Sequence, residues 1–133
     1  MKKFLFMLVV SLLLILSFTL IAQAAAATAQ FDPTASYAFD LTGRWTCNDG
    51  GTYYLRQLGN EVFWYGEYSP INPGWSNVAR GKILNSTLFL EWADVPKGSN
   101  MGTGLLMLKI VSNNRLERVD LSGGGFGGSI WSR

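Results

Sequence analysis

Every second connection in this chain is a two-residue turn, and this spacing constrains the fold more than any other feature. The three turns are Gly59-Asn60, Asn85-Ser86 and Asn113-Asn114, and each lies between runs of β-branched and aromatic residues. Glycine and asparagine tolerate positive φ, which suits them to two-residue hairpins. A two-residue hairpin forces the strands on either side to run antiparallel. The sequence therefore predicts a sheet of consecutive antiparallel strands.

Eight strands fit the pattern from residue 41 onward, and no window shows sustained apolar residues at helical spacing. We expect strands at 42–47, 52–58, 61–68, 76–84, 87–94, 104–112, 115–121 and 129–133. The remaining connections, at 48–51, 69–75, 95–103 and 122–128, are longer and contain Gly or Pro. In an up-and-down meander they share one end of the sheet, which predicts a closed floor and a mouth built of loops.

A closed sheet of eight strands has an interior just wide enough for side chains or one small ligand. We therefore expect an all-β, eight-stranded antiparallel up-and-down barrel at 41–133, with an open sandwich as the alternative. In the strand at 87–94, Leu88, Leu90, Trp92 and Asp94 share one face, because side chains alternate along a strand. We expect this face to point inward and Asp94 to lie at the mouth.

The opening of the domain, Gly43-Arg44-Trp45, is similar to the G-x-W opening of the calycin barrels, which include lipocalins, avidins and several secreted bacterial inhibitors. The resemblance implies that Trp45 lies low in the barrel and that an arginine near the last strand, here Arg133, packs across it. Such a pair would close the barrel by cation–π stacking. The chain departs from lipocalins in having no expected helix after the strands and no disulfide, and its domain is nearer in size to avidins.

The first segment has the order of a secretory signal peptide. Lys2 and Lys3 precede an apolar run at 4–21 and a small-residue stretch at 22–27. We expect 1–24 to be a signal peptide and 25–40 a flexible leader, with an uncleaved membrane anchor as the alternative. The sequence thus predicts a secreted, periplasmic or cell-envelope protein that has no membrane contact after cleavage.

Charge and composition exclude several classes of function. Removal of Lys2 and Lys3 leaves nine basic residues against nine acidic ones, so the domain lacks the positive charge that nucleic acid binding needs. The chain has no histidine and one cysteine, which excludes histidine-dependent nucleophiles, histidine-ligated zinc and an internal disulfide. We expect no nucleic acid partner, no cofactor and no metal site. The turn Asn48-Asp49-Gly50 has too few clustered oxygen ligands for calcium, and we expect Cys47 to be a buried apolar filler.

Candidate site residues lie where the expected strands reach the mouth. We expect Trp45, Trp64 and Trp92 to be core residues, whereas Trp75 follows Pro73 and Gly74 in a loop and has a binding role or a structural one. Aromatic rings beside polar side chains are typical of sites for sugars or amphipathic small molecules. The residues near the mouth that make up this combination are Tyr68, Asn72, Trp75, Asn77, Asp94, Lys97, Asn100 and Phe126.

These residues predict non-enzymatic binding of a small molecule or short glycan at the mouth. The alternative is a protein-interaction module, such as a secreted enzyme inhibitor, that presents the same loops to a partner. Glu67 and Asp94 end at the same expected rim, but glycoside hydrolysis needs two carboxylates about 5 to 9 Å apart, one with a raised pKa. Asp49 and Glu91 are the other two candidate carboxylates. Nothing in the sequence determines the distance between any two of the four, so we expect no enzymatic activity.

The glycine-rich run at 122–128 formally contains the G-x-G-x-x-G motif of dinucleotide-binding loops. That motif acts at the start of a helix within a βαβ unit, and no such unit is expected here. We interpret the run as a mobile loop at the mouth. Phe126, its one large side chain, is a candidate lid.

Overall fold

The structure is a computed structural model, and it describes residues 38–71 and 73–133. All eight expected strands are present in this part of the chain, which contains no helix, and their bounds lie within two residues of those expected. The expected signal peptide and all but the last residues of the expected leader lie outside the described residues. The strands are β1 (Gly43–Cys47), β2 (Thr52–Leu58), β3 (Glu61–Glu67), β4 (Ser76–Leu84), β5 (Thr87–Asp94), β6 (Thr103–Ser112), β7 (Arg115–Gly123) and β8 (Ile130–Ser132).

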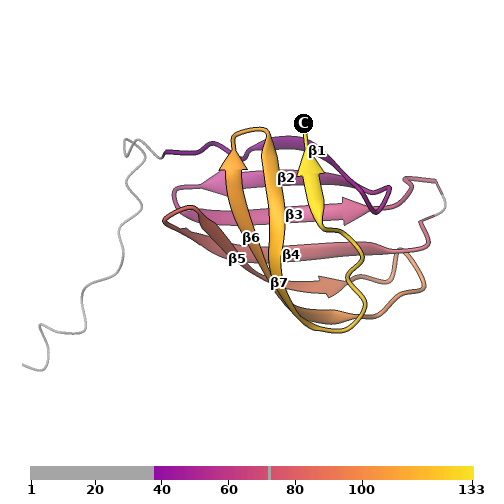
Figure 1. Cartoon of the computed structure of the whole chain (residues 1–133). Helices are drawn as coiled ribbons and strands as arrows, with labels where there is room; N and C mark the ends of the chain where they lie inside the picture. The colour runs from indigo at the N-terminus through magenta and orange to yellow at the C-terminus, as the bar shows by residue number, and fades with distance from the viewer. Residues whose placement is uncertain (1–37, 72) are drawn as a thin grey trace, which may run out of the picture. The chain divides into compact units, whose positions relative to one another are not determined.

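The sheet closes on itself. Each strand pairs antiparallel with the next, and β8 pairs with β1, which completes the barrel. Figure 1 shows the yellow β8 beside the purple β1. The closing register is short, with Thr46 opposite Ser132 and Cys47 opposite Trp131. The predicted closed barrel is therefore confirmed, and the open sandwich is not formed.

Burial follows the predicted alternation of side chains. On β5, Leu88, Leu90 and Trp92 are buried, whereas Phe89 and Glu91 are exposed. Buried apolar side chains from every strand, most of them leucines and aromatic residues, meet in one continuous core. Because an eight-stranded barrel is only wide enough for side chains or one small ligand, this core fills the interior. In this arrangement, the open space for a ligand lies at an end of the barrel or on its outer wall.

The three tight turns lie together at the floor, and two of them use positive φ. Gly59 has a φ of 67° and Asn85 a φ of 56°. The turn at Asn113 and Asn114 has no positive φ, and the register shifts by one residue between Ile110 and Ser112 just before it. A β-bulge of this kind increases the local twist of the strand pair. This third hairpin therefore combines a β-bulge with a turn that has no positive φ, whereas its two asparagines predict a turn with positive φ.

The segment before β1 covers the floor. The Leu41 side chain is fully buried, and its carbonyl accepts a hydrogen bond from Trp45 Nε1 at 3.0 Å. Gln57 Oε1 accepts from the Leu41 backbone N at 2.9 Å, and its Nε2 donates to the Phe39 carbonyl at 3.0 Å. Phe39 and Leu41 thus form hydrogen bonds with β2 at the floor; Phe39 belongs to the described part of the stretch at 25–40.

Arg133 joins three parts of the floor. Its guanidinium carbon lies 4.7 Å from the centre of the Trp45 ring. Its nitrogens donate to the carbonyls of Thr42 (2.6 Å), Asp40 (2.7 Å) and Asn113 (2.7 Å). One side chain thus links the start of β1, the segment before it and the turn between β6 and β7.

We expect Arg133→Ala to lower the free energy of unfolding by about 1–2 kcal/mol. The variant loses three charge-assisted hydrogen bonds and a cation–π contact, although solvent weakens them because the side chain is exposed. Urea unfolding measures the change. The control is Arg115→Ala, which removes a surface ion pair with Glu117 and should change stability by less than about 0.5 kcal/mol. Equal losses in the two variants would contradict this role of Arg133.

Candidate functional site

The four longer loops lie at the mouth, and hydrogen bonds hold them together in pairs. Asn48, between β1 and β2, accepts through Oδ1 from the backbone N of Ser129 (2.9 Å) and Ile130 (3.0 Å). Its Nδ2 also donates to Ser129 Oγ at 2.8 Å. On the other side, the backbone N and the Oγ of Ser99 both donate to the Gly74 carbonyl, at 3.1 and 3.2 Å. The mouth therefore has a rim made of two hydrogen-bonded loop pairs.

A cavity of about 240 Å³ lies between these loops, and all four loops contribute to it. Its lining combines aromatic rings with hydrogen-bonding side chains, and none of the described residues that line it is basic. The rings are those of Tyr53, Trp75, Trp92 and Phe126, and the polar side chains are those of Asp49, Asn77, Asp94 and Asn100. We call this cavity the mouth pocket.

Both carboxylates of the mouth pocket are held by neighbouring groups. Asp49 Oδ1 accepts from the Gly51 backbone N at 2.8 Å, and its Oδ2 accepts from the Tyr53 hydroxyl at 2.7 Å. Asp94 Oδ2 accepts from the Gly102 backbone N at 2.8 Å. Burial, and then the negative charge of Asp49, raise the pKa of Tyr53 far above its usual value. Tyr53 therefore stays neutral and remains a donor to Asp49.

Asn77 connects the pocket to the core. Its side chain is 3% exposed, and its Oδ1 accepts from the Trp64 indole Nε1 at 3.0 Å. This bond satisfies a buried indole N–H and orients the amide of Asn77 at the base of the pocket. The Oδ1 end of this buried amide is therefore held in place by the indole of Trp64.

Trp75 forms one wall of the pocket because Gly51 leaves room for its ring. A Cβ at residue 51 would lie 2.4 Å from Cη2 of Trp75, closer than packed atoms approach. The ring centre of Trp75 is 5.8 Å from that of Tyr53, and Trp75 is only partly buried. The wall therefore combines a fixed ring position with some exposed aromatic surface.

The structure brings five of the expected site residues together and leaves the others elsewhere. Trp75, Asn77, Asp94, Asn100 and Phe126 all line the mouth pocket. The Tyr68 side chain is 56% exposed outside the lining, with its ring 6.4 Å from that of Trp75. Asn72 lies outside the described residues.

Lys97 turns away from the pocket and pairs with Glu67. Its Nζ forms an ion pair with Glu67 Oε2, which also accepts from the Tyr65 hydroxyl at 2.8 Å. The hydrogen bond from Lys97 lowers the pKa of Glu67, and the same bond raises the pKa of Lys97. Glu67 shares the outward row of β3 with Tyr65, whereas Asp94 lines the pocket. Glu67 thus lacks the raised pKa that a general acid paired with Asp94 would need.

Sequence reasoning left Asp49, Tyr53 and Trp92 out of the expected site. Tyr53 is the inward residue of β2 closest to the mouth, so counting strand positions from the loop identifies it. Asp49 follows from its place in the loop between β1 and β2 at the same end. Trp92 belongs to the core as expected, and it also lines the base of the pocket.

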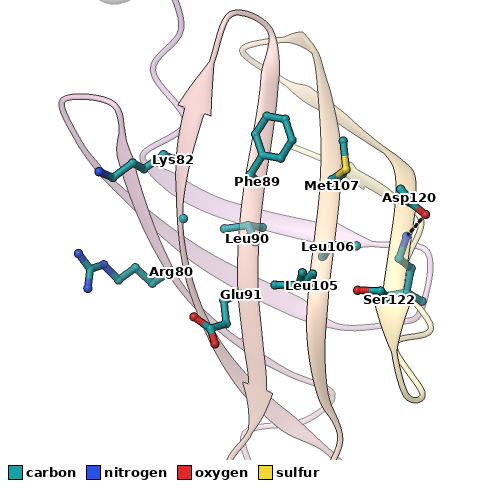
Figure 2. A pocket seen from close by; sticks show the side chains of 12 residues that line it. Arg80, Lys82, Phe89, Leu90, Glu91, Leu105, Leu106, Met107, Asp120 and Ser122 are labelled. Carbon is teal, nitrogen blue, oxygen red and sulfur yellow. Dashed lines mark hydrogen bonds between the residues drawn. The ribbon is translucent and has the colours of Figure 1, made fainter.

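A larger groove of about 430 Å³ lies on the outer wall, across β4 to β7. Figure 2 shows Phe89, Leu105 and Met107 between Lys82 at one margin and Asp120 at the other. Small-molecule sites place their polar groups so that they converge on the ligand. Here Lys82 and Asp120 stand at opposite margins, and Glu91 lies on β5 opposite Arg80 of β4, so the charged groups are spread along the groove. The mouth pocket is therefore the better candidate for a small ligand.

The fold and the site together define a closed eight-stranded barrel with an aromatic-walled, acidic pocket at its mouth. No family model matches the chain, and neither does any curated protein or solved structure. No helix in the described part of the chain is long and apolar enough to cross a membrane. Within residues 38–71 and 73–133, no three Cys, Asp or Glu side chains are grouped so that they could hold a metal ion.

We expect the Glu67–Lys97 pair to stabilise the protein only above acidic pH. A carboxyl whose folded pKa is lowered contributes stability above its unfolded pKa and loses it as pH falls through the folded pKa. Glu67→Gln should therefore lower the urea midpoint at about pH 7 and have no effect at about pH 2. Glu91→Gln, at an exposed position on β5, is the control. A Glu67→Gln effect of the same size at both pH values would rule out the ion pair as its cause.

We expect the thiol of Cys47 to be unreactive in the folded protein. Cys47 is 8% exposed, and burial raises its pKa to about 12. Thiol reagents attack the thiolate, which is then scarce at about pH 8. Reaction with an aromatic disulfide reagent should be slow in buffer and complete in urea. Fast, stoichiometric reaction of the folded protein would contradict this expectation.

Proposed function

We propose that this protein binds a small molecule or the end of a short glycan in the mouth pocket, without catalysing a reaction. The main observation behind this proposal is that two carboxylates, two amides and several aromatic rings line the same cavity. Hydroxyl groups of a sugar can donate to carboxylates such as Asp49 and Asp94, while C–H faces stack on rings such as that of Trp75. This arrangement supports a neutral ligand rich in hydrogen-bond donors.

The size of the pocket supports a ligand of about one ring. Its volume of about 240 Å³ is below the range of roughly 300–1,000 Å³ that is usual for drug-sized ligands. The core fills the barrel below it, so a longer glycan would extend outward past the loops. A terminal sugar residue or a single-ring compound fits this space.

We also propose that the protein is related to the calycin barrels and is exported from the cytoplasm. The closed barrel with Arg133 stacked on Trp45 supports a calycin-type relationship. The signal-peptide pattern at residues 1–24 supports a secreted, periplasmic or cell-envelope location. A binding protein outside the cytoplasm, with no nucleic acid or membrane partner, is consistent with both.

A second candidate function is protein interaction through the rim. Ile71 is 94% exposed, Met101 68% and Tyr68 56%, and all three lie in or beside the mouth loops. Exposed apolar side chains that gather at one end of a protein often belong to an interface. This observation supports a secreted inhibitor or similar module that uses the loops as its contact surface.

We expect Trp75→Ala to weaken ligand binding by about tenfold or more, because it removes the aromatic wall. Titration of tryptophan fluorescence against monosaccharides, oligosaccharides and small hydrophobic compounds identifies the ligand, and calorimetry gives its affinity. Phe89→Ala, an exposed ring on the outer wall, is the matched control and should bind as the natural protein does. An identified ligand that binds both variants equally would place its site elsewhere.

The rim variant Ile71→Ser with Met101→Ser separates the two candidate functions. It removes apolar surface from the loops but leaves the pocket lining intact. Small-molecule binding should be unchanged in this variant. The interaction module would be favoured by two results together. The folded natural protein would bind none of the tested compounds, and it would capture a protein partner that the rim variant does not capture.

A further inference from the structure

Phe126 lies inside the barrel rather than over it. Its side chain is 7% exposed, although it belongs to the loop between β7 and β8. Its ring centre lies 4.9 Å from that of Trp92, 5.9 Å from Trp64, 6.0 Å from Trp131 and 6.4 Å from Tyr53. The ring thus occupies an aromatic cage at the base of the mouth pocket, and it reaches the cage from a loop rather than from a strand.

The loop that carries Phe126 has more glycine than its closed form needs. Gly123 and Gly125 have positive φ, and a Cβ at Gly128 would lie 2.7 Å from Cys47 Sγ. Gly124 and Gly127 show neither constraint, because their φ is not positive and a Cβ would meet nothing closer than 3.8 Å. Glycine raises the conformational entropy of a mobile chain. Glycine at these two positions is therefore not required by the arrangement of the loop in the structure, and it would stabilise a more mobile, open one.

Two of the indoles that surround Phe126 also have an N–H group without a hydrogen-bond partner. In the described part of the chain, the buried side-chain polar atoms with no hydrogen bond are Trp92 Nε1 and Trp131 Nε1. Both indoles pack against the ring of Phe126. An unpaired buried donor carries a desolvation cost that an acceptor atom would remove. The Phe126 ring has no acceptor atom and offers an N–H group only its π face.

We propose that Phe126 is a displaceable plug, and that the ligand is a single aromatic ring bearing a hydroxyl or carbonyl oxygen, which takes the place of Phe126. The ligand ring occupies the cage, and its oxygen accepts from a Trp92 or Trp131 indole. A phenolic hydroxyl can also donate to a pocket carboxylate. This inference rests on the proposed function and names its ligand class.

Arg118 defines how the plug is held and released. Its Nη1 donates to the carbonyls of Phe126 (2.9 Å) and Gly128 (2.7 Å). When Phe126 leaves the cage, the first bond breaks while the second can stay and hold the end of the loop beside β8. The ligand binds only the open form of the loop. Its apparent affinity for the protein is therefore its affinity for the open form multiplied by the fraction of molecules that are open.

The test uses the natural protein with phenol and toluene, which share a ring but differ in the oxygen. Nuclear magnetic resonance follows the indole N–H signals and amide hydrogen exchange at residues 124–127. We expect phenol to shift the Trp92 and Trp131 indole signals, to bind at least about tenfold more tightly than toluene, and to speed exchange in the loop. The Trp45 indole, which donates to the Leu41 carbonyl at the floor, is the internal control.

Two variants change the plug in opposite directions. Phe126→Ala removes it and should tighten phenol binding by about tenfold, because the cage is always open. Gly124→Ala with Gly127→Ala keeps the plug but stiffens the loop, and should weaken phenol binding by about threefold. Because the main readouts come from the natural protein, the test stands even if Phe126→Ala does not fold.

Four results would overturn the inference. Phenol that binds only to Phe126→Ala would mean that the substitution created a cavity and that Phe126 is a fixed core residue. If phenol binds while amide hydrogen exchange at residues 124–127 is unchanged or slowed, then phenol lies above the Phe126 ring and does not replace it. Equal affinity for toluene would remove the role of the indole donors. A sugar that binds in the Trp75 assay without loop opening would leave the proposed function standing and refute only the plug.

Discussion

The whole structure depends on closure of the sheet by β8, a strand of three residues. It pairs with β1 through Thr46 and Cys47 and with β7 on its other side. Trp131 at its centre is fully buried and packs against Trp64 and Tyr53, with ring centres 5.8 and 5.7 Å apart. Without β8, two strand edges would stand open and the aromatic core would lose one wall. Arg133, directly after this strand, clamps the floor below it.

The same closure shapes the mouth. To reach β8, the chain leaves the end of β7 and crosses the mouth as the glycine-rich loop, and this crossing places the Phe126 ring within the aromatic core. Asn48 then binds the start of β8 through Ser129 and Ile130. The segment that completes the barrel is therefore also the segment that covers the base of the pocket. Stability and site geometry are coupled here by chain connectivity.

The fold could be predicted because its signals are local. Two-residue turns such as Gly59-Asn60 determine which strands are neighbours, and alternation on β5 determines that Leu88, Leu90 and Trp92 point inward. The third hairpin differed from the expected form because its bulge near Ile110 depends on the fit between β6 and β7. A turn dipeptide alone carries no information about that fit.

The candidate site was only partly predictable for the same reason. Asn77 and Asp94 belong to strands whose direction was known, so their place at the mouth followed. The outward turn of Lys97 toward Glu67 and the descent of Phe126 into the core depend on loop conformations and on contacts between distant residues. The bond from Tyr53 to Asp49 likewise depends on the shape of the loop between β1 and β2. No local pattern encodes these arrangements.

The pairing of the mouth loops has a consequence for how such a barrel diversifies. One pair is joined by Asn48 and Ser129, and the other by Ser99 and Gly74, while none of these residues reaches the tight turns at the floor. Insertions or exchanges at the mouth therefore leave the hairpins that define the strand order untouched. A single altered loop would lose its bonded neighbour, however. The unit of evolutionary change, or of engineering by loop grafting, is two loops exchanged together.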